Sequence, residues 1–295
     1  MNNQWSDFIQ TTQELYMSRE ARFTDQNKDL WIGHIGVRHG MKVLEIGCGG
    51  GVFCHKLKKY IPDLDITGLD RDTNHIKYAR EKAEELGLDC TFTEGEIGSL
   101  PFADETFDLV YSHTVAEHVA PELFFGEQHR VLKPGGRFCV LSVRTRLNLK
   151  DMPQEEPSDE EKQLMGKLWS KAGEVSEQYQ VGEYEMDEHE YPHRLNEYGF
   201  RDVDVQMFNV MDYCPDNHSV SEEEAAGQIN SRRLISLDRV RKGIRLAPEA
   251  LTEKERERLE SLINERYDKR LAKYRAGIPV WDFTTSCILA VSGVK

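Results

Sequence analysis

Short apolar runs alternate with longer amphipathic stretches between residues 41 and 143. The short runs are rich in Val, Ile, Leu and Phe, as buried strands are. The longer stretches repeat apolar positions at helical spacing, and one of them, residues 73–86, is followed by Gly87, a common helix stop. This alternation predicts a parallel sheet with helices on both faces. The expected strands are residues 42–47, 64–70, 90–96, 107–113 and 137–143.

Outside this region the pattern is less regular. Residues 5–23 place apolar side chains at spacings of three, four and seven, which predicts one amphipathic helix. Residues 184–198 predict another helix, broken or begun near Pro192. Residues 199–208 alternate apolar and polar positions as a strand does, and residues 281–294 are rich in strand-forming side chains.

The acidic, proline-containing residues 151–162 are typical of a solvated linker, and helices follow them. Three Ser/Thr-x-x-Glu pairs indicate helix starts: Ser158 with Glu161, Ser221 with Glu224, and Thr252 with Glu255. We therefore predict one α/β domain with two helical insertions, near residues 147–183 and 212–277.

Composition narrows the class of protein. A chain of 295 residues is long enough for a sizeable core, and its net charge of -14 disfavours a nucleic-acid partner held by phosphate contacts. The first ten residues lack a secretory signal pattern, and no apolar run approaches the roughly 20 residues of a membrane span. The six cysteines are scattered, which favours reduced, buried thiols over disulfides or a metal site. These features predict a cytoplasmic protein with no metal, no membrane contact and no nucleic acid.

The stretch VLEIGCGGG, residues 43–51, joins the first expected strand to a glycine-rich turn. A dinucleotide-binding turn would need a glycine where Val52 stands, and a P-loop would need Lys followed by Ser or Thr. Glu45 in the strand would repel a pyrophosphate and attract a cation or an ammonium group. The turn therefore predicts a ligand with positive charge and little negative charge.

VLEIGCGGG resembles the first motif of class I S-adenosylmethionine (SAM)-dependent methyltransferases. Three further matching stretches follow in the family's order: ITGLDRD at 66–72, GEIGSLPFADETFDLVYSHTVAEHV at 95–119 and RVLKPGGRFCV at 130–140. The resemblance covers residues 41–143 and is to the small-molecule type, similar to the ubiquinone and menaquinone biosynthesis group. It implies SAM as cofactor and S-adenosylhomocysteine (SAH) as product.

For the fold, the resemblance implies a Rossmann-like, doubly wound, mostly parallel sheet of seven strands with an antiparallel last strand, plus helical cap insertions. The whole chain, 1–295, is then a single methyltransferase domain. Its expected parts are an N-terminal helical cap (1–35), the SAM-binding core (36–146), a helical insertion (147–183), a core helix with the sixth strand (184–211), a two-helix insertion (212–277) and the last strand (278–295).

The resemblance also implies roles for residues of the first two motifs. Glu45 would act on the methionine ammonium, and Gly47 and Gly49 would let the backbone approach the cofactor. Asp70 would accept hydrogen bonds from the ribose hydroxyls, and Arg71 would lie along the adenine face.

Later motifs complete the expected cofactor site. Glu96, where the family often has Asp, would accept from the adenine amino group beside the Ile97 backbone. Ser112 and His113 would border the methionine part. Cys48 is counted with these residues as part of the turn, more as filler than as a nucleophile.

Methyl transfer from a sulfonium needs mainly alignment and exclusion of water, and a base only where the acceptor must lose a proton early. His118, His113 and Tyr16 are the candidate catalytic residues, although a structural role is equally open for each histidine. Glu117 either orients one of the histidines or faces water.

The predicted function is SAM-dependent methylation of a small molecule, because insertions that enclose a site suit a small ligand. An alternative is a SAM-binding sensor or a catalytically retired homologue, since methyl transfer requires no invariant nucleophile. A dehydrogenase using NAD is less expected in view of Val52 and Glu45. The acceptor and its reacting atom stay open, and the two-helix insertion is either a lid or a homodimer contact.

Overall fold

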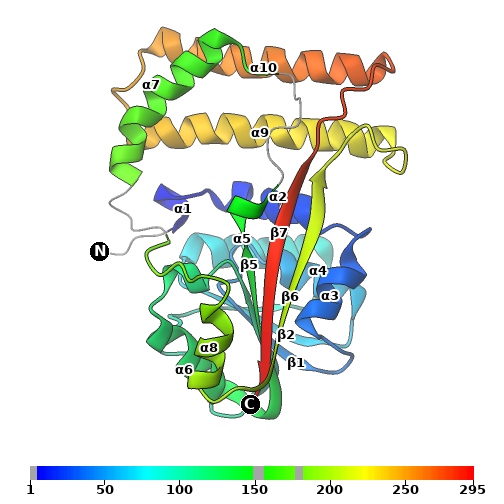
Figure 1. Cartoon of the computed structure of the whole chain (residues 1–295), viewed down its shortest axis with the longest axis vertical. Helices are drawn as coiled ribbons and strands as arrows, with labels where there is room; N and C mark the ends of the chain where they lie inside the picture. Colours follow the sequence, from blue (N-terminus) through cyan, green and yellow to red (C-terminus); the bar gives the residue numbers. More distant parts are fainter. Residues whose placement is uncertain (1–4, 149–155, 177–181) are drawn as a thin grey trace.

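A seven-stranded sheet organises the computed structural model, which describes residues 5–148, 156–176 and 182–295 (Figure 1). Its strand order is β3-β2-β1-β4-β5-β7-β6, and only β7 runs antiparallel to its neighbours. The strands are β1 (Lys42–Ile46), β2 (Asp65–Asp70), β3 (Thr91–Glu94), β4 (Phe107–His113), β5 (Leu132–Val143), β6 (Arg201–Tyr213) and β7 (Thr284–Val294). The predicted Rossmann-like, doubly wound fold is confirmed.

Helices cover both faces of this sheet and add a separate layer beyond one end. They are α1 (Trp5–Phe8), α2 (Thr12–Arg22), α3 (Lys28–Ile35), α4 (Val52–Tyr60), α5 (Thr73–Leu86), α6 (Pro121–Val131), α7 (Asp159–Ser176), α8 (Glu190–Glu197), α9 (Glu222–Leu246) and α10 (Glu253–Arg275), with 3-10 turns η1 (Ala116–His118) and η2 (Thr145–Leu147). No helix in the described ranges is long and apolar enough to cross a membrane.

Alternation along the strands divides the core into two halves. In β1, Val43 packs with α3, α4 and α5, whereas Leu44 and Ile46 pack with α6 and α8 on the opposite face. Successive strand side chains point to opposite faces, so a strand buried on both sides needs apolar residues at nearly every position. Glu45 is the one buried polar residue of β1, and it is 2% exposed.

A third apolar cluster holds α7, α9 and α10 together as a cap. Figure 1 shows α9 and α10 side by side beyond the sheet, with α2 between α9 and the strands. The capping boxes at Ser221 and Thr252 are confirmed. At Ser158 only half of the expected box forms: the Glu161 N–H donates to the Ser158 hydroxyl at 3.2 Å, because the Glu161 carboxylate accepts from Arg266 instead.

Two predicted helices have different bounds in the structure. The expected helix over residues 5–23 is interrupted, because the Thr11 side chain accepts from the Glu14 N–H at 3.2 Å and so caps a new helix, α2. The expected helix over 184–198 is confirmed only as α8, which starts close to Pro192. Proline lacks the N–H that a helix interior requires, so it is tolerated only in the first turn.

The cap should depend on Leu168, which is fully buried in the third cluster. A Cβ atom at Gly243 on α9 would lie 2.7 Å from its Cδ2, so the two helices are closely packed. We expect Leu168→Ala to lower the free energy of unfolding by about 2–5 kcal/mol. The control Leu234→Ala, at a 40% exposed position of α9, should change it by less than about 0.5 kcal/mol. Equal losses in urea unfolding would contradict this packing.

Candidate functional site

The turn between β1 and α4 brings the backbone to the floor of a cavity. Gly47, Gly49 and Gly51 have φ values of 65°, 53° and 84°, a region that favours glycine. A Cβ atom at Gly47 would lie 2.6 Å from Cγ2 of Val115, and one at Gly49 would lie 2.6 Å from Cδ2 of Leu15. Side chains at these positions would therefore clash with two elements that border the cavity.

Asp70 ends β2 and connects the glycine turn to the next loop. Its Oδ2 accepts from the Gly49 N–H at 2.8 Å, and its Oδ1 accepts from the Asp72 N–H at 2.9 Å. The Nδ1 atom of buried His75 lies 3.5 Å from Oδ1. A carboxylate has about four lone-pair sites, so two stay available to hydroxyl donors from a ligand.

Glu45 lies beside this turn on β1, almost fully buried. Its Oε2 accepts from the Cys54 thiol at 2.9 Å and from the Tyr111 hydroxyl at 3.0 Å. Burial raises the pKa of Glu45 to about 7, although these two hydrogen bonds act in the opposite direction. A cationic ligand group beside it would favour the ionised carboxylate.

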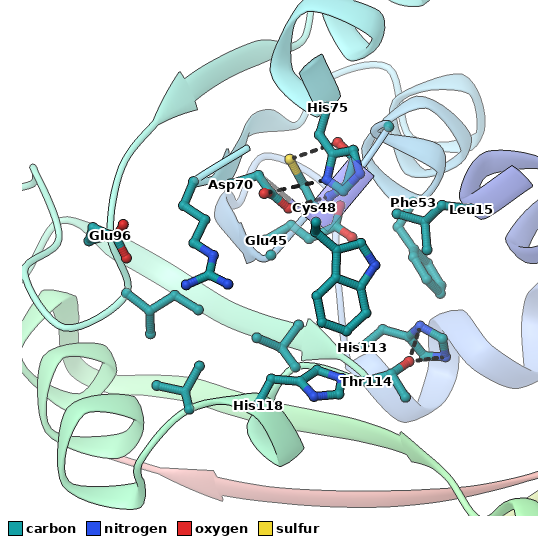
Figure 2. Close-up of a pocket in the computed structure, with 18 of the residues that line it drawn as sticks. Leu15, Glu45, Cys48, Phe53, Asp70, His75, Glu96, His113, Thr114 and His118 are labelled. Atoms are coloured by element: carbon teal, nitrogen blue, oxygen red, sulfur yellow. Dashed lines mark hydrogen bonds and ion pairs between the residues drawn. The ribbon is translucent and has the colours of Figure 1, made fainter. Parts of the chain in front are cut away.

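These residues line one cavity of about 410 Å³, a size typical of a small-molecule site. Nearly all the sequence-predicted site residues lie on its wall: Tyr16, Glu45, Gly47, Cys48, Gly49, Asp70, Arg71, Glu96, Ile97, His113 and His118. In the view of Figure 2, Glu45, Asp70 and Glu96 lie above His113 and His118. Ser112 is buried but not on the wall, because neighbouring strand side chains point to opposite faces.

The three candidate catalytic side chains differ in what their polar atoms already contact. The Tyr16 hydroxyl lies 3.4 Å from Nδ1 of His55, and burial raises the pKa of Tyr16. Nδ1 of His118 accepts from the Gly182 N–H at 3.0 Å, so the proton of its neutral ring belongs on Nε2. Burial lowers the pKa of His118 to about 4. The centroid of its ring lies 4.7 Å from the centroid of the Trp5 ring.

His113 is more enclosed than His118. Its ring contacts Phe23 edge-on at 5.1 Å and Phe53 at 5.2 Å, and its Nδ1 lies 2.9 Å from the Thr114 hydroxyl. Burial, reinforced by Arg19, lowers the pKa of His113 well below its ordinary value. Both histidines are therefore neutral near pH 7.

Glu117 orients neither histidine in the structure and does not face water. Its carboxylate is 8% exposed and accepts a short hydrogen bond from the Ser142 hydroxyl of β5. Burial raises the pKa of Glu117. The two expectations for this residue are wrong, because η1 turns its side chain toward the sheet.

Sequence reasoning missed several wall residues, above all Arg19 of α2. Its Nη1 donates to the Ser18 hydroxyl at 2.9 Å, and it forms no ion pair with a carboxylate in the described part of the chain. Burial and Arg22 lower the pKa of Arg19 to about 9, so it stays charged at neutral pH. Its position three residues after Tyr16, on the same helix face, was the available signal. Trp5, Leu15, His75, Thr114 and Tyr184 also line the cavity.

Sequence comparison supplies independent matches. The sequence model of a family described as "Methyltransferase domain" matches residues 38–199. A sterol 24-C-methyltransferase of Aspergillus fumigatus is 38% identical over 110 residues, which are 36% of this chain and 29% of that protein. A ubiquinone biosynthesis O-methyltransferase of Brucella anthropi is 34% identical over 109 residues, 37% of this chain and 43% of that protein. The matches span less than half the length of these relatives.

Structure comparison gives the same fold at low identity. Phosphoethanolamine N-methyltransferase 2 of Haemonchus contortus, solved in complex with S-adenosyl-L-methionine, superposes with a TM-score of 0.54 and 17% identity, covering 100% of this chain and 60% of that one. The YcgJ protein of Bacillus subtilis superposes with a TM-score of 0.51 and 18% identity, covering 92% and 99%. Likeness at this identity shows the fold alone.

The raised pKa of Glu45 makes folding pH-dependent. Between its ordinary value of 4.5 and about 7, the folded chain holds a proton that the unfolded chain releases, so stability is lost as pH rises through this window. Relative to Glu45→Gln, the wild type should therefore lose about 3 kcal/mol of unfolding free energy between pH 4.5 and pH 8. Urea unfolding of both proteins at several pH values measures this difference. A difference that does not change with pH would contradict this prediction, and so would an equally pH-dependent difference between the wild type and the exposed control Glu81→Gln.

Proposed function

Because the chain belongs to the methyltransferase-domain family, whose model matches more than half of it, we propose that it transfers a methyl group from SAM to a small organic acceptor. One observation carries the proposal. Glu45 and Asp70, at the ends of adjacent parallel strands, border one cavity together with a turn that only glycine allows. Open α/β sheets bind their ligands at this edge.

The charges along the cavity wall suit SAM better than a dinucleotide. In this proposal Glu45 faces the methionine ammonium, and Asp70 accepts the ribose hydroxyls with its two remaining lone-pair sites. Glu96, with Ile97 beside it, receives the adenine amino group, and Arg71 lies along the ring. Three carboxylates on one wall repel a pyrophosphate but attract a cationic ligand.

Arg19 completes the recognition of the amino-acid end of the cofactor. It is charged, lies on the cavity wall, and has no carboxylate partner among the described residues. Arg19 and Glu45 both line this cavity. We therefore assign the SAM carboxylate to Arg19 and the SAM ammonium to Glu45.

Methyl transfer forms a bond from the acceptor atom to the methyl carbon and breaks the carbon–sulfur bond, so SAM leaves as the neutral thioether SAH. Alignment and exclusion of water supply most of the rate enhancement. We propose His113 as the group that accepts a proton from the acceptor. When Nδ1–H of His113 donates to the Thr114 hydroxyl, its Nε2 is free to accept, whereas the neutral ring of His118 carries its proton on Nε2. His118 then presents its Nε2–H as a donor, and Tyr16 serves to position the cover over the cofactor.

The acceptor in this proposal is small and largely apolar. Leu15, Phe53, Val115, Val119 and Leu123 supply apolar wall, and Trp5 of α1 covers His118. The names of similar proteins support a small molecule, since they state a sterol, ubiquinone biosynthesis and, for a protein of Mycolicibacterium smegmatis, a fatty acid. Assays on such compounds would identify the substrate of this chain and the atom that receives the methyl group.

The proposal also covers the cellular compartment, the partners and the assembly of the protein. Six free cysteines, five of them buried, support a reducing compartment such as the cytoplasm. The charge of -14 supports the absence of a nucleic-acid partner. A homodimer through the insertions and the division into cap and core parts stay predictions, which light scattering and limited proteolysis test.

Cofactor binding is the direct test. We expect calorimetry to detect SAM and SAH, and Asp70→Ala to weaken both by a factor of about 100 or more, because two charge-assisted hydrogen bonds are lost. Asp65→Ala is the matched control, since Asp65 begins the same strand at its exposed end. Wild-type protein that binds neither nucleoside would refute the proposal. Transfer of labelled methyl to an extract of small molecules then separates an enzyme from a sensor.

The assignment of Arg19 has its own test. Arg19→Gln should weaken SAH binding about tenfold or more, because a charged hydrogen bond to the carboxylate is removed. Binding of 5′-methylthioadenosine, which lacks the amino-acid end, should be unchanged. If the variant weakened both ligands equally, Arg19 would act on the shape of the site and not on the carboxylate.

A further inference from the structure

A second cavity, of about 300 Å³, lies in the cap and shares no wall residue with the first. Its wall comes from α9, α10, the end of β6 and the segment before β7, elements that meet in the upper part of Figure 1. The wall residues are Pro157, Tyr213, Arg232, Ile235, Ser236, Arg239, Arg266, Tyr267, Arg270 and Asp282. Four of these are arginines, in a chain whose net charge is -14.

The one carboxylate on this wall is fully engaged by the protein. Asp282 is 3% exposed, and its two oxygens accept from Nε of Arg270 at 3.0 and 3.1 Å. Its Oδ1 also accepts from Nη2 of Arg270 at 2.7 Å, and its Oδ2 from the Tyr213 hydroxyl at 3.0 Å. Arg270 also donates from Nη2 to Asp216 at 2.7 Å, so two carboxylates share this guanidinium. Arg266 pairs with Glu161 at 2.9 Å, and Arg232 lies 3.5 Å from Asp212. Arg239 is therefore the one wall arginine without a carboxylate partner among the described residues.

Two guanidinium groups keep unused donors. Arg270 is 1% exposed, and its Nη1 is buried without a hydrogen-bond partner in the described part of the chain. A buried donor without an acceptor is costly, so it calls for a ligand or water. Arg239 lies at the exposed mouth, where its guanidinium packs 5.3 Å from the Trp169 ring and pairs with no carboxylate among the described residues.

We propose that this cap cavity binds the phosphate group of a small molecule. A tetrahedral phosphate accepts hydrogen bonds in several directions, and arginines that converge from α9 and α10 match it better than they match a planar carboxylate. The Ser236 and Tyr267 hydroxyls are hydrogen-bonded to each other at 3.0 Å, which leaves one hydroxyl hydrogen of the pair to donate on the same wall. This site is separate from methyl transfer, and α9, which carries Arg239, also packs on α2 above the first cavity.

Phosphate titration tests the proposal without SAM. Calorimetry with inorganic phosphate, and separately with glycerol 3-phosphate, would be run against sodium chloride at equal ionic strength. We expect binding by the wild type and about tenfold weaker binding by Arg239→Gln. The control Arg241→Gln, on the same helix but outside the wall and paired with Asp238 at 2.9 Å, should bind as the wild type does. Tighter binding of the ester would identify a phosphorylated metabolite, and equal binding would identify free phosphate.

A second variant places a carboxylate where the ligand belongs. Ser236→Asp should raise the thermal midpoint in the absence of phosphate and abolish phosphate binding, because its carboxylate would pair with the unused donors. SAH binding by all three variants should be unchanged, which separates this site from the cofactor site. Three results would each overturn the proposal: no wild-type binding above the chloride blank, equal binding by Arg239→Gln, or unchanged phosphate affinity in Ser236→Asp.

Discussion

The hydrogen bond from the Gly49 N–H to Asp70 joins the glycine turn of one strand to the end of the next. It fixes the turn against the end of β2 and places a carboxylate at the cavity wall. The glycines of the turn present backbone atoms, not side chains, to the cavity. Val115 and Leu15 occupy the volume that side chains at Gly47 and Gly49 would need, so later segments of the fold close over this turn. The shape of the cavity floor and its enclosure both depend on this one link between β1 and β2.

The N-terminal segment extends this dependence to the loop after β2. Ser6 donates to Asp72 through its N–H at 2.7 Å and through its hydroxyl at 3.1 Å, which ties α1 to that loop. Trp5 then covers His118, and α2 brings Arg19 to the cavity. Segments far apart in the sequence therefore build the cover of this cavity together.

Charge is divided between the two cavities. Three carboxylates and two arginines line the cavity at the sheet, whereas four arginines and one carboxylate line the cavity of the cap. A protein with excess negative charge concentrates its cations only where packing holds them together, and Arg266 and Arg270 are held by Glu161 and Asp282. Two basic residues of α9, Arg232 and Arg239, border this cavity.

The sequence by itself determined most of the sheet and the glycine turn, because strand alternation and glycine spacing are local signals. The resemblance of its motifs to a known family added nearly all the predicted residues that line the cavity. The sequence did not determine the break at Thr11, the inward turn of Glu117 or the exclusion of Ser112 from the cavity wall. Arg19 and the arginines of the cap were equally hidden. Only the tertiary structure decided these features, since each depends on which distant segment lies beside the residue. Glu117 contacts Ser142, Arg270 contacts Asp282, and Arg19 lies on the wall of the first cavity.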